Sequence, residues 1–202
     1  MQVRIFDDMT QCTEQEVQRL LPLVSRQRRE QALRYKHTFG QFCCLKSWIL
    51  LKEVLGQIGY NRIQSEEFRY NEHGKPYFEG GPYFSISHCK TGIAVAVADE
   101  PVGIDIESIR RADEELMERV LNNDERLAVS GERDRDRAFT KLWTQKEAVV
   151  KMLGTGIESF EQLQGLLPGY RDTGTPGYRI ETIENENYIY SIAYGKLCSI
   201  SA

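Results

Sequence analysis

Residues 83–108 constrain the fold more than any other part of the chain. They read YFSISHCKTGIAVAVADEPVGIDIES, which is three strand-like runs separated by the turn sequences CKTG and DEP. Runs rich in β-branched and aromatic residues between such turns are typical of consecutive strands. The sequence therefore predicts an antiparallel meander in this stretch.

The third run, VGIDIES at 102–108, places two acids on one side of a strand. Successive side chains of a strand point to opposite faces, so Asp105 and Glu107 share one face, about 7 Å apart. The aliphatic residues between them share the other face. Taken alone, such a pair on an edge strand is more often solvated than bound to a metal.

Helices are predicted on both sides of these strands. TEQE at 13–16 has the spacing of a capping box with Thr13 as N-cap, and the basic stretch 25–37 follows it. Apolar positions recur at helical spacing over 42–55 and again over 138–153, where Gly154 and Gly156 end the pattern. Residues 178–184 and 187–194 then resemble two further strands.

The order helix, turn, strands occurs twice, over 40–98 and over 138–194, although almost no residue identity supports a repeat. This order predicts an α+β fold built from two similar halves. We place them at residues 1–104 and 105–202, with VGIDIES near their junction. Because ligands often bind between such halves, we expect the active site in the cleft.

Composition limits the possible partners and the compartment. With 26 basic and 30 acidic side chains, the net charge of −4 argues against a general nucleic-acid coat. The five cysteines include no CxxC pair, which favours reduced thiols in the cytoplasm over a disulfide framework or a zinc site. No signal peptide or membrane-spanning run is readable.

Single features of the second long helix do not decide a function. Glu147 and Lys151 are i, i+4 neighbours, and an isolated pair of this kind is usually a surface ion pair worth a few tenths of a kcal/mol. Trp143 and Lys146 carry no signal alone. By itself, His88 after the FSIS run is most simply a hydrogen-bonded structural histidine.

Four motifs occur along the chain in this order: Gly74-Lys75-Pro76, Ser85-Ile86-Ser87-His88, Gly103-Ile104-Asp105-Ile106-Glu107, and residues 143–151 with the sequence WTQKEAVVK. Together they span residues 74–151. Their order and spacing resemble those of the 4′-phosphopantetheinyl transferases of the monomeric surfactin-synthetase type. The resemblance implies two α+β halves related by a pseudo-twofold axis, with coenzyme A and Mg²⁺ in the cleft.

The resemblance also implies a reaction. Family members transfer the phosphopantetheine arm of coenzyme A to a serine of an apo acyl or peptidyl carrier protein and release adenosine 3′,5′-bisphosphate. Asp105, Glu107 and Glu147 match the family's three acids around Mg²⁺. Glu147, or a water it holds, would be the base, and Lys151 would contact the coenzyme where charge develops on the phosphoryl group.

Further contacts to coenzyme A follow from the same match. Ser87 and His88 would bind the 3′-phosphate, and Lys75 with Pro76 would line the adenine and phosphate wall. Arg28, from the basic helix, would add another phosphate contact.

One position departs from the family pattern. Where the family commonly has an Arg-Thr pair, this chain has Cys43-Cys44, so one expected phosphate contact is missing. This leaves the affinity for coenzyme A in doubt, or transfers that contact to Arg28, Arg34 or Lys46.

Carrier proteins are typically acidic, which calls for basic and apolar residues beside the cleft. Our hypothesis for this docking surface is the segment after Glu107. It comprises Arg110, Arg111, Met117, Val120 and Leu121.

Two other functions remain open at this point. Three acids and a lysine around Mg²⁺ could serve a phosphodiesterase or nucleotidyl transferase that cuts another diphosphate. A non-catalytic relative could hold coenzyme A or a carrier without turnover, although a binder has no need for a complete metal site. The resemblance implies a monomer that acts without nucleic acid or membrane, and surface complementarity, not the catalytic motifs, selects the carrier.

Overall fold

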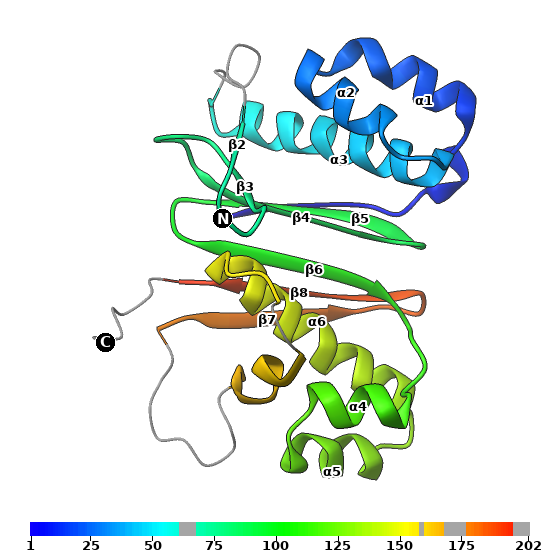
Figure 1. Cartoon of the computed structure of the whole chain (residues 1–202), viewed down its shortest axis with the longest axis vertical. Helices are drawn as coiled ribbons and strands as arrows, with labels where there is room; N and C mark the ends of the chain where they lie inside the picture. The colour runs from blue at the N-terminus through cyan, green and yellow to red at the C-terminus, as the bar shows by residue number, and fades with distance from the viewer. Residues whose placement is uncertain (61–67, 158–159, 168–176, 196–202) are drawn as a thin grey trace.

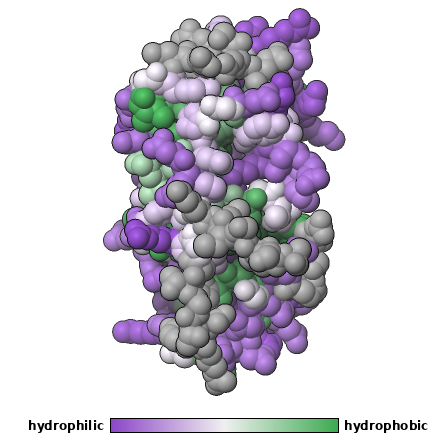
Figure 2. Space-filling model, turned by 90° about the vertical axis from the view of Figure 1, so that its left-hand side faces the viewer, coloured by the Kyte–Doolittle hydropathy of each residue, from purple (hydrophilic) through white to green (hydrophobic). Residues whose placement is uncertain are grey.

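The computed structural model describes residues 1–60, 68–157, 160–167 and 177–195. It has two three-stranded antiparallel sheets with helices at both ends of the molecule, which confirms the predicted α+β class (Figure 1). Hydrophilic side chains dominate the surface seen from the side (Figure 2). None of the helices in the described ranges is long and apolar enough to cross a bilayer.

The first sheet contains β1 (Gln2–Phe6), β4 (Tyr83–Cys89) and β5 (Gly92–Ala98), and the second contains β6 (Val102–Ser108), β7 (Arg179–Glu184) and β8 (Tyr188–Tyr194). A short hairpin is formed by β2 (Arg69–Tyr70) and β3 (Pro76–Tyr77). The helices are α1 (Glu14–Leu20), α2 (Arg26–Leu33), α3 (Thr38–Gln57), α4 (Glu114–Val120), α5 (Asn123–Gly131) and α6 (Arg135–Leu153).

The two large sheets pack against each other through small and aliphatic side chains. Every residue of β5 is buried, because α3 covers one of its faces and the second sheet covers the other. Strand alternation explains the division of side chains. Ile93, Val95 and Val97 join the core under α3, while Ala94, Ala96 and Ala98 pack with Val102, Ile104 and Ile106 of β6.

The two sheets share one connectivity. In the first, the strand order is β1-β5-β4 and α3 lies between β1 and the β4–β5 hairpin in sequence. In the second, the order is β6-β8-β7 and α6 lies between β6 and the β7–β8 hairpin. The order predicted from sequence is therefore present, whereas the pseudo-twofold axis stays a prediction. The predicted boundary between residues 104 and 105 falls inside β6, and the division into halves also stays a prediction.

The predicted meander is correct for two strands and wrong for the third. β4 and β5 form an antiparallel hairpin, but β6 pairs with β8 in the other sheet. Both edges of β5 are already occupied by β1 and β4, so β6 cannot pair with β5. In addition to the packing on β5, Ser85 of β4 contacts β6, because its Oγ accepts the Ile104 backbone N–H at 3.0 Å.

Helix ends follow the local sequence closely. Thr13 caps α1 by accepting the backbone N–H of Glu16, but the Glu16 carboxylate pairs with Arg19 and does not complete the capping box. Helix α4 begins at Glu114, and the side chain of its N-cap Asp113 accepts the backbone N–H of Leu116. Gly154 ends α6 in the left-handed conformation, with φ of 73°, as the sequence predicts.

Candidate active site

Strand β6 presents Gly103, Asp105 and Glu107 on the face opposite its aliphatic side chains, and α6 lies directly against that face. A Cβ atom at Gly103 would be only 2.0 Å from the carbonyl oxygen of Ala148 and 2.3 Å from the backbone nitrogen of Met152. The absence of a side chain at Gly103 therefore allows the helix backbone to rest on the strand. The predicted separation of acidic and aliphatic faces is confirmed.

Asp105 is nearly buried, with 4% of its surface exposed. Its Oδ1 accepts hydrogen bonds from Ser87 Oγ at 2.7 Å and from Lys151 Nζ at 2.5 Å. Its Oδ2 is also buried and has no hydrogen-bond partner within the described ranges. A buried carboxylate oxygen without a donor is costly, so this atom is available to a cation.

Glu107 lies beside Trp143 and Arg110. Burial raises the pKa of the Glu107 carboxyl, and the negative charge of Asp105 raises it further. Arg110 and the Trp143 side chain oppose this rise, and Arg110 Nη1 lies 3.9 Å from Glu107 Oε1. The Arg110 guanidinium is also stacked 4.5 Å from the centre of the Trp143 ring, which fixes its position.

Glu147 comes from α6, one helical turn before Lys151. Burial raises the pKa of its carboxyl to about 6, and the charges of Asp105 and Glu107 act in the same direction, while Lys151 opposes them. The negative charges of Asp105 and Glu107 on the strand therefore act on Glu147 on the helix. A carboxylate with a pKa close to neutral is suited to accept a proton at physiological pH.

The donor set agrees in its chemistry with Mg²⁺, which prefers carboxylate oxygens. Asp105 offers a buried oxygen without a partner among the described residues, and a cation would stabilise the ionised forms of Glu107 and Glu147, which burial and neighbouring negative charges disfavour. No group of three acids, histidines or cysteines in the described part of the chain is already close enough to hold a metal ion. The acids would therefore have to draw closer together around a bound ion.

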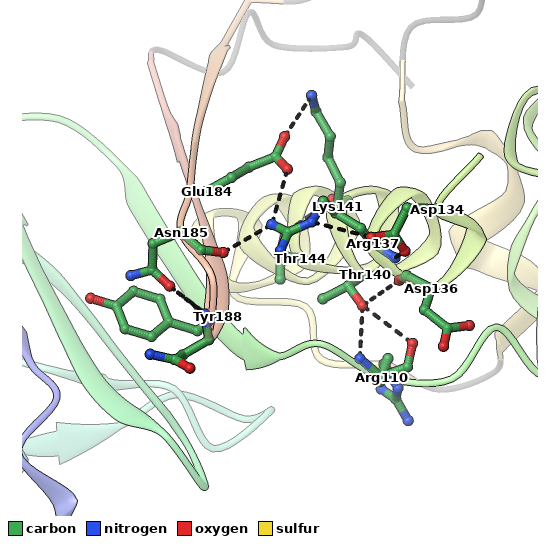
Figure 3. Close-up of polar contacts among 11 residues, drawn as sticks. Arg110, Asp134, Asp136, Arg137, Thr140, Lys141, Thr144, Glu184, Asn185 and Tyr188 are labelled. Carbon is green, nitrogen blue, oxygen red and sulfur yellow. Dashed lines mark hydrogen bonds and ion pairs between the residues drawn. The ribbon is translucent and has the colours of Figure 1, made fainter. Parts of the chain in front are cut away.

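Contacts along its length fix α6 over the second sheet (Figure 3). Arg137 Nη1 donates at 2.9 Å to the carbonyl of Asn185, which lies in the turn between β7 and β8. It also lies 3.6 Å from the carboxylate of Glu184, the last residue of β7. Thr140 Oγ1 accepts the backbone N–H of Arg110 at 3.0 Å. The helix that carries Glu147 is thus tied to both the β7–β8 turn and the segment after β6.

Lys146 is a structural residue that sequence reasoning missed. Its side chain is fully buried, and its Nζ lies 2.8 Å from Glu125 Oε1 and donates to the Leu163 carbonyl at 2.5 Å. Burial lowers the pKa of the Lys146 ammonium, and Glu125 opposes this effect. A signal existed, because Lys146 follows Trp143 and precedes Val150 at helical spacing, within the apolar stripe of α6.

A pocket of about 360 Å³ opens beside Glu147 and Lys151. A second pocket, of about 570 Å³, adjoins it, and the two share the wall formed by Lys75, Pro76 and neighbouring residues. Lys75 and Pro76 thus line a cavity next to Glu147 and Lys151, and their contact with coenzyme A stays a prediction. The other residues around the first pocket include Ser85, Val150, Gly154 and Gly156.

The remaining residues predicted to contact coenzyme A have different surroundings. Ser87 directs its hydroxyl to Asp105, and His88 is exposed with its ring edge-on to Phe39. Although the His88 side chain reaches solvent, partial desolvation lowers its pKa, and the positive charges of Lys151 and Arg28 lower it further. The phosphate contacts of Ser87 and His88 stay predictions.

Arg28 is buried among protein acceptors. Its guanidinium donates to the Cys44 carbonyl at 3.0 Å, to Ser47 Oγ at 3.2 Å and to Gln31 Oε1 at 2.8 Å. It also lies over the Trp48 ring. These contacts give Arg28 a structural role, and a phosphate contact would have to compete with them.

The hypothetical carrier surface needs correction. Met117, Val120 and Leu121 have at most 1% of their surface exposed and pack in the core beside α6, so they do not form a docking surface. Their helical spacing reflects packing against α6. Arg111 is exposed and Arg110 is half-buried, so only these two remain available from the predicted set.

Comparisons with known proteins address the family. A family model described as the 4′-phosphopantetheinyl transferase superfamily matches residues 101–194, from just before β6 to the end of β8. The chain is 30% identical over 161 residues to the 4′-phosphopantetheinyl transferase psf-1 of Bacillus pumilus, which is 78% of this chain and 68% of that protein.

Two further relatives match shorter regions. The 4′-phosphopantetheinyl transferase gsp of Aneurinibacillus migulanus is 29% identical over 136 residues, 66% of this chain and 57% of the relative. The 4′-phosphopantetheinyl transferase AcpT of Salmonella typhimurium is 37% identical over 109 residues, 50% of this chain and 57% of the relative. The chain therefore spans 57% to 68% of the length of these three relatives.

The matched region contains both the strand and the helix on which the candidate site is built. The psf-1 match extends this similarity to most of the chain. On this similarity, the chain belongs to the 4′-phosphopantetheinyl transferase superfamily.

Proposed function

We propose that this protein transfers the 4′-phosphopantetheine arm of coenzyme A to a serine hydroxyl of an apo carrier protein. The observation that carries the proposal is the meeting of β6 and α6. Asp105 and Glu107 on the strand face Glu147 and Lys151 on the helix, beside a pocket. Family membership selects this reaction among those that a group of acids and a lysine can support.

In the proposed reaction, the carrier serine oxygen forms a bond to the phosphorus that bears the pantetheine arm. The bond from that phosphorus to the bridging oxygen of the pyrophosphate breaks, and adenosine 3′,5′-bisphosphate leaves. Glu147 takes the serine proton, either directly or through a water molecule. Lys151 lies one helical turn further on, where its ammonium can stabilise negative charge on the phosphoryl oxygens.

Asp105, Glu107 and Glu147 would hold Mg²⁺, which would neutralise the pyrophosphate oxygens when bound. The buried Oδ2 of Asp105 supports this assignment, because it has no hydrogen-bond donor in the described part of the chain. Ser87 would orient Asp105 through its hydrogen bond to Oδ1. We assign coenzyme A to the pocket lined by Lys75, Pro76 and Lys151, with Ser87, His88 and Arg28 as further candidates for phosphate contacts.

Incubation with Mg²⁺, coenzyme A and a panel of apo carriers is expected to add one phosphopantetheine arm to a carrier, as measured by mass spectrometry. Chelation of the metal should stop the labelling. Asp105→Asn preserves the size of the side chain but removes its charge, and we expect it to slow labelling at least about 100-fold.

Thermal unfolding of Asp105→Asn, compared with the unchanged protein, checks that the loss of labelling is not a loss of fold. If no carrier in the panel gains an arm, the proposed transfer is wrong. Release of the bisphosphate without a modified carrier would instead indicate a hydrolase that acts on coenzyme A.

The carrier would approach the exposed arginine after β6. Arg111→Glu should raise the KM for an acidic carrier about tenfold and leave the KM for coenzyme A within about twofold, because only the carrier meets this charge. We choose Arg111 over Arg110 because Arg110 also packs on Trp143. Arg4→Glu, on the exposed surface of β1, is the matched control. Equal carrier kinetics for the two variants would reject this docking site.

We also infer a cytoplasmic, monomeric enzyme. The cysteines support the cytoplasmic location, because Cys12, Cys43, Cys44 and Cys89 are all free. Burial raises the pKa of the Cys43 thiol to about 12, which makes it unreactive. Cys198 lies outside the described residues. The monomeric state is carried over from the family resemblance alone.

A further inference from the structure

The turn between β2 and β3 is organised by a single asparagine. Asn71 Oδ1 accepts the backbone N–H groups of His73 at 3.1 Å and Lys75 at 2.8 Å. The Asn71 backbone also pairs with Lys75 and Gly74 across the turn. The Asn71 side chain thus determines the shape of this turn through its oxygen, which leaves its amide nitrogen free for other contacts.

That nitrogen reaches a different part of the chain. Asn71 Nδ2 donates to the carbonyl of Gly154 at 2.7 Å, at the end of α6 and 83 positions away in sequence. Lys75 Nζ donates to the carbonyls of Met152 and Val102, both at 3.2 Å. One hairpin therefore binds the end of α6 and the start of β6 at the same time.

These contacts satisfy a recurrent need of helix ends. The last carbonyls of a helix have no partner within the helix, and a positive charge near them is favourable. Lys75 and Asn71 supply two donors to this end of α6, and both also touch the space beside Gly154, where a Cβ atom would meet Asn71 Nδ2 and Lys75 Cδ at 3.1 Å. The hairpin therefore fits the left-handed glycine closely.

These contacts lie close to the acids in sequence, so they can affect the geometry of the site. Met152 directly follows Lys151, whose Nζ donates a hydrogen bond to Asp105, and Gly154 lies two residues further on. Val102 begins the strand that carries Asp105 and Glu107. A shift of the hairpin would therefore move the end of α6 relative to β6, and with it the contact between Lys151 and Asp105.

We propose that Asn71 and Lys75 are positioning residues that lock the last turn of α6 against the start of β6. The ammonium of Lys75 acts through two backbone carbonyls, whereas the family resemblance implies a direct contact with coenzyme A. The kinetic part of this inference rests on the proposed function, and the structural part does not.

Asn71→Asp tests the lock selectively. Aspartate keeps the oxygen that organises the turn but cannot donate to the Gly154 carbonyl. We expect amide hydrogen exchange over residues 151–156 to become about tenfold faster, the size expected when one hydrogen bond is lost. Exchange of the Gly74 amide inside the turn should stay within about twofold. Glu72→Gln, whose exposed side chain lies in the same turn, is the matched control and should change neither.

Kinetics supply the second measurement. Asn71→Asp should lower kcat about tenfold and leave the KM for coenzyme A within about twofold, because Asn71 fixes Lys151 without touching the substrate. Lys75→Met should likewise lower kcat, whereas a rise in the KM for coenzyme A alone would indicate a direct contact and overturn the assignment of Lys75.

Unchanged exchange at residues 151–156 in Asn71→Asp would overturn the lock itself. The exchange measurement needs no substrate. If the unchanged protein transfers no arm, the proposed function fails, while the exchange result still decides whether the hairpin anchors α6.

Discussion

Glu147→Gln is expected to make the protein more stable while it abolishes transfer. The pKa of Glu147 is raised from its usual 4.5 to about 6, so ionising this carboxyl costs about 2 kcal/mol more in the folded protein than in the unfolded chain. Glutamine has almost the same shape and no charge to ionise. The free energy of unfolding at pH 7, without metal, should therefore rise by about 2 kcal/mol.

The sign of the pH dependence follows from the same shift. Because the folded pKa of Glu147 is raised, its contribution to stability is fully present below pH 4.5 and is lost as the pH rises through about 6. The advantage of the glutamine variant should consequently be about 2 kcal/mol at pH 7 and close to zero at pH 4. Urea unfolding of both proteins at the two pH values, with a chelator present, measures this difference.

Activity should change in the opposite direction. Loss of the carboxylate removes the base, so we expect the rate of carrier labelling to fall at least about 100-fold. Glu53→Gln, at an exposed position of α3, is the matched control and should alter neither property. A glutamine variant that labels normally would contradict the role of Glu147, and equal unfolding curves at pH 7 would contradict the strained carboxylate.

We expect the acids of this site to lower the stability of the fold while they support transfer, and this opposition points to a functional site. A fold selected for stability alone would not place Glu107 and Glu147 where burial and the negative charge of Asp105 both disfavour their ionised forms. Stability is given up where ligand binding or chemistry needs a preformed charge. A divalent cation would remove the conflict, since it would stabilise all three ionised forms.

The sequence predicted the elements of the fold well where local patterns determine them. The alternation in VGIDIES fixed which side chains of β6 share a face, and Gly154 identified the end of α6. The partner of β6 could not be predicted in this way. β6 does not pair with β5 because both edges of β5 are occupied, one by β4 and the other by β1 from the start of the sequence.

The candidate site was predictable only as a combination of motifs. Asp105 and Lys151 are 46 positions apart, and no local pattern indicates their 2.5 Å contact. The sequence alone did not separate surface from core in one place, because Met117 and Val120 were assigned to a docking surface and in fact pack in the core. The same ambiguity hid Lys146, whose burial depends on Glu125 from another helix.

Gly103→Ala is expected to damage the protein more than any other single methyl group we can propose. The new Cβ atom would lie 2.0 Å from the Ala148 carbonyl oxygen and 2.3 Å from the Met152 nitrogen. Both are backbone atoms inside a helix that is fixed along its length, so neither can move aside cheaply. Overpacking of a core costs about 1–3 kcal/mol, and we expect a loss of unfolding free energy at or above the upper end of this range.

Gly131→Ala provides the control, because a Cβ atom at Gly131 in α5 has no neighbour within 4 Å. There, alanine should leave the stability unchanged or raise it by up to about 1 kcal/mol. Urea unfolding of the two variants, side by side, measures the difference. If Gly103→Ala unfolds at the same urea concentration as Gly131→Ala, then α6 does not rest on β6 as described.

The methyl group should also push α6 away from β6 and so separate Lys151 from Asp105. Gly103 and Asp105 share one face of β6, so the distance at which α6 passes Gly103 also sets the approach of Lys151 to Asp105. We therefore expect Gly103→Ala to lose carrier labelling even at temperatures where the variant remains folded. Normal labelling by a folded but destabilised variant would show that the acids and the lysine need not be held at this spacing.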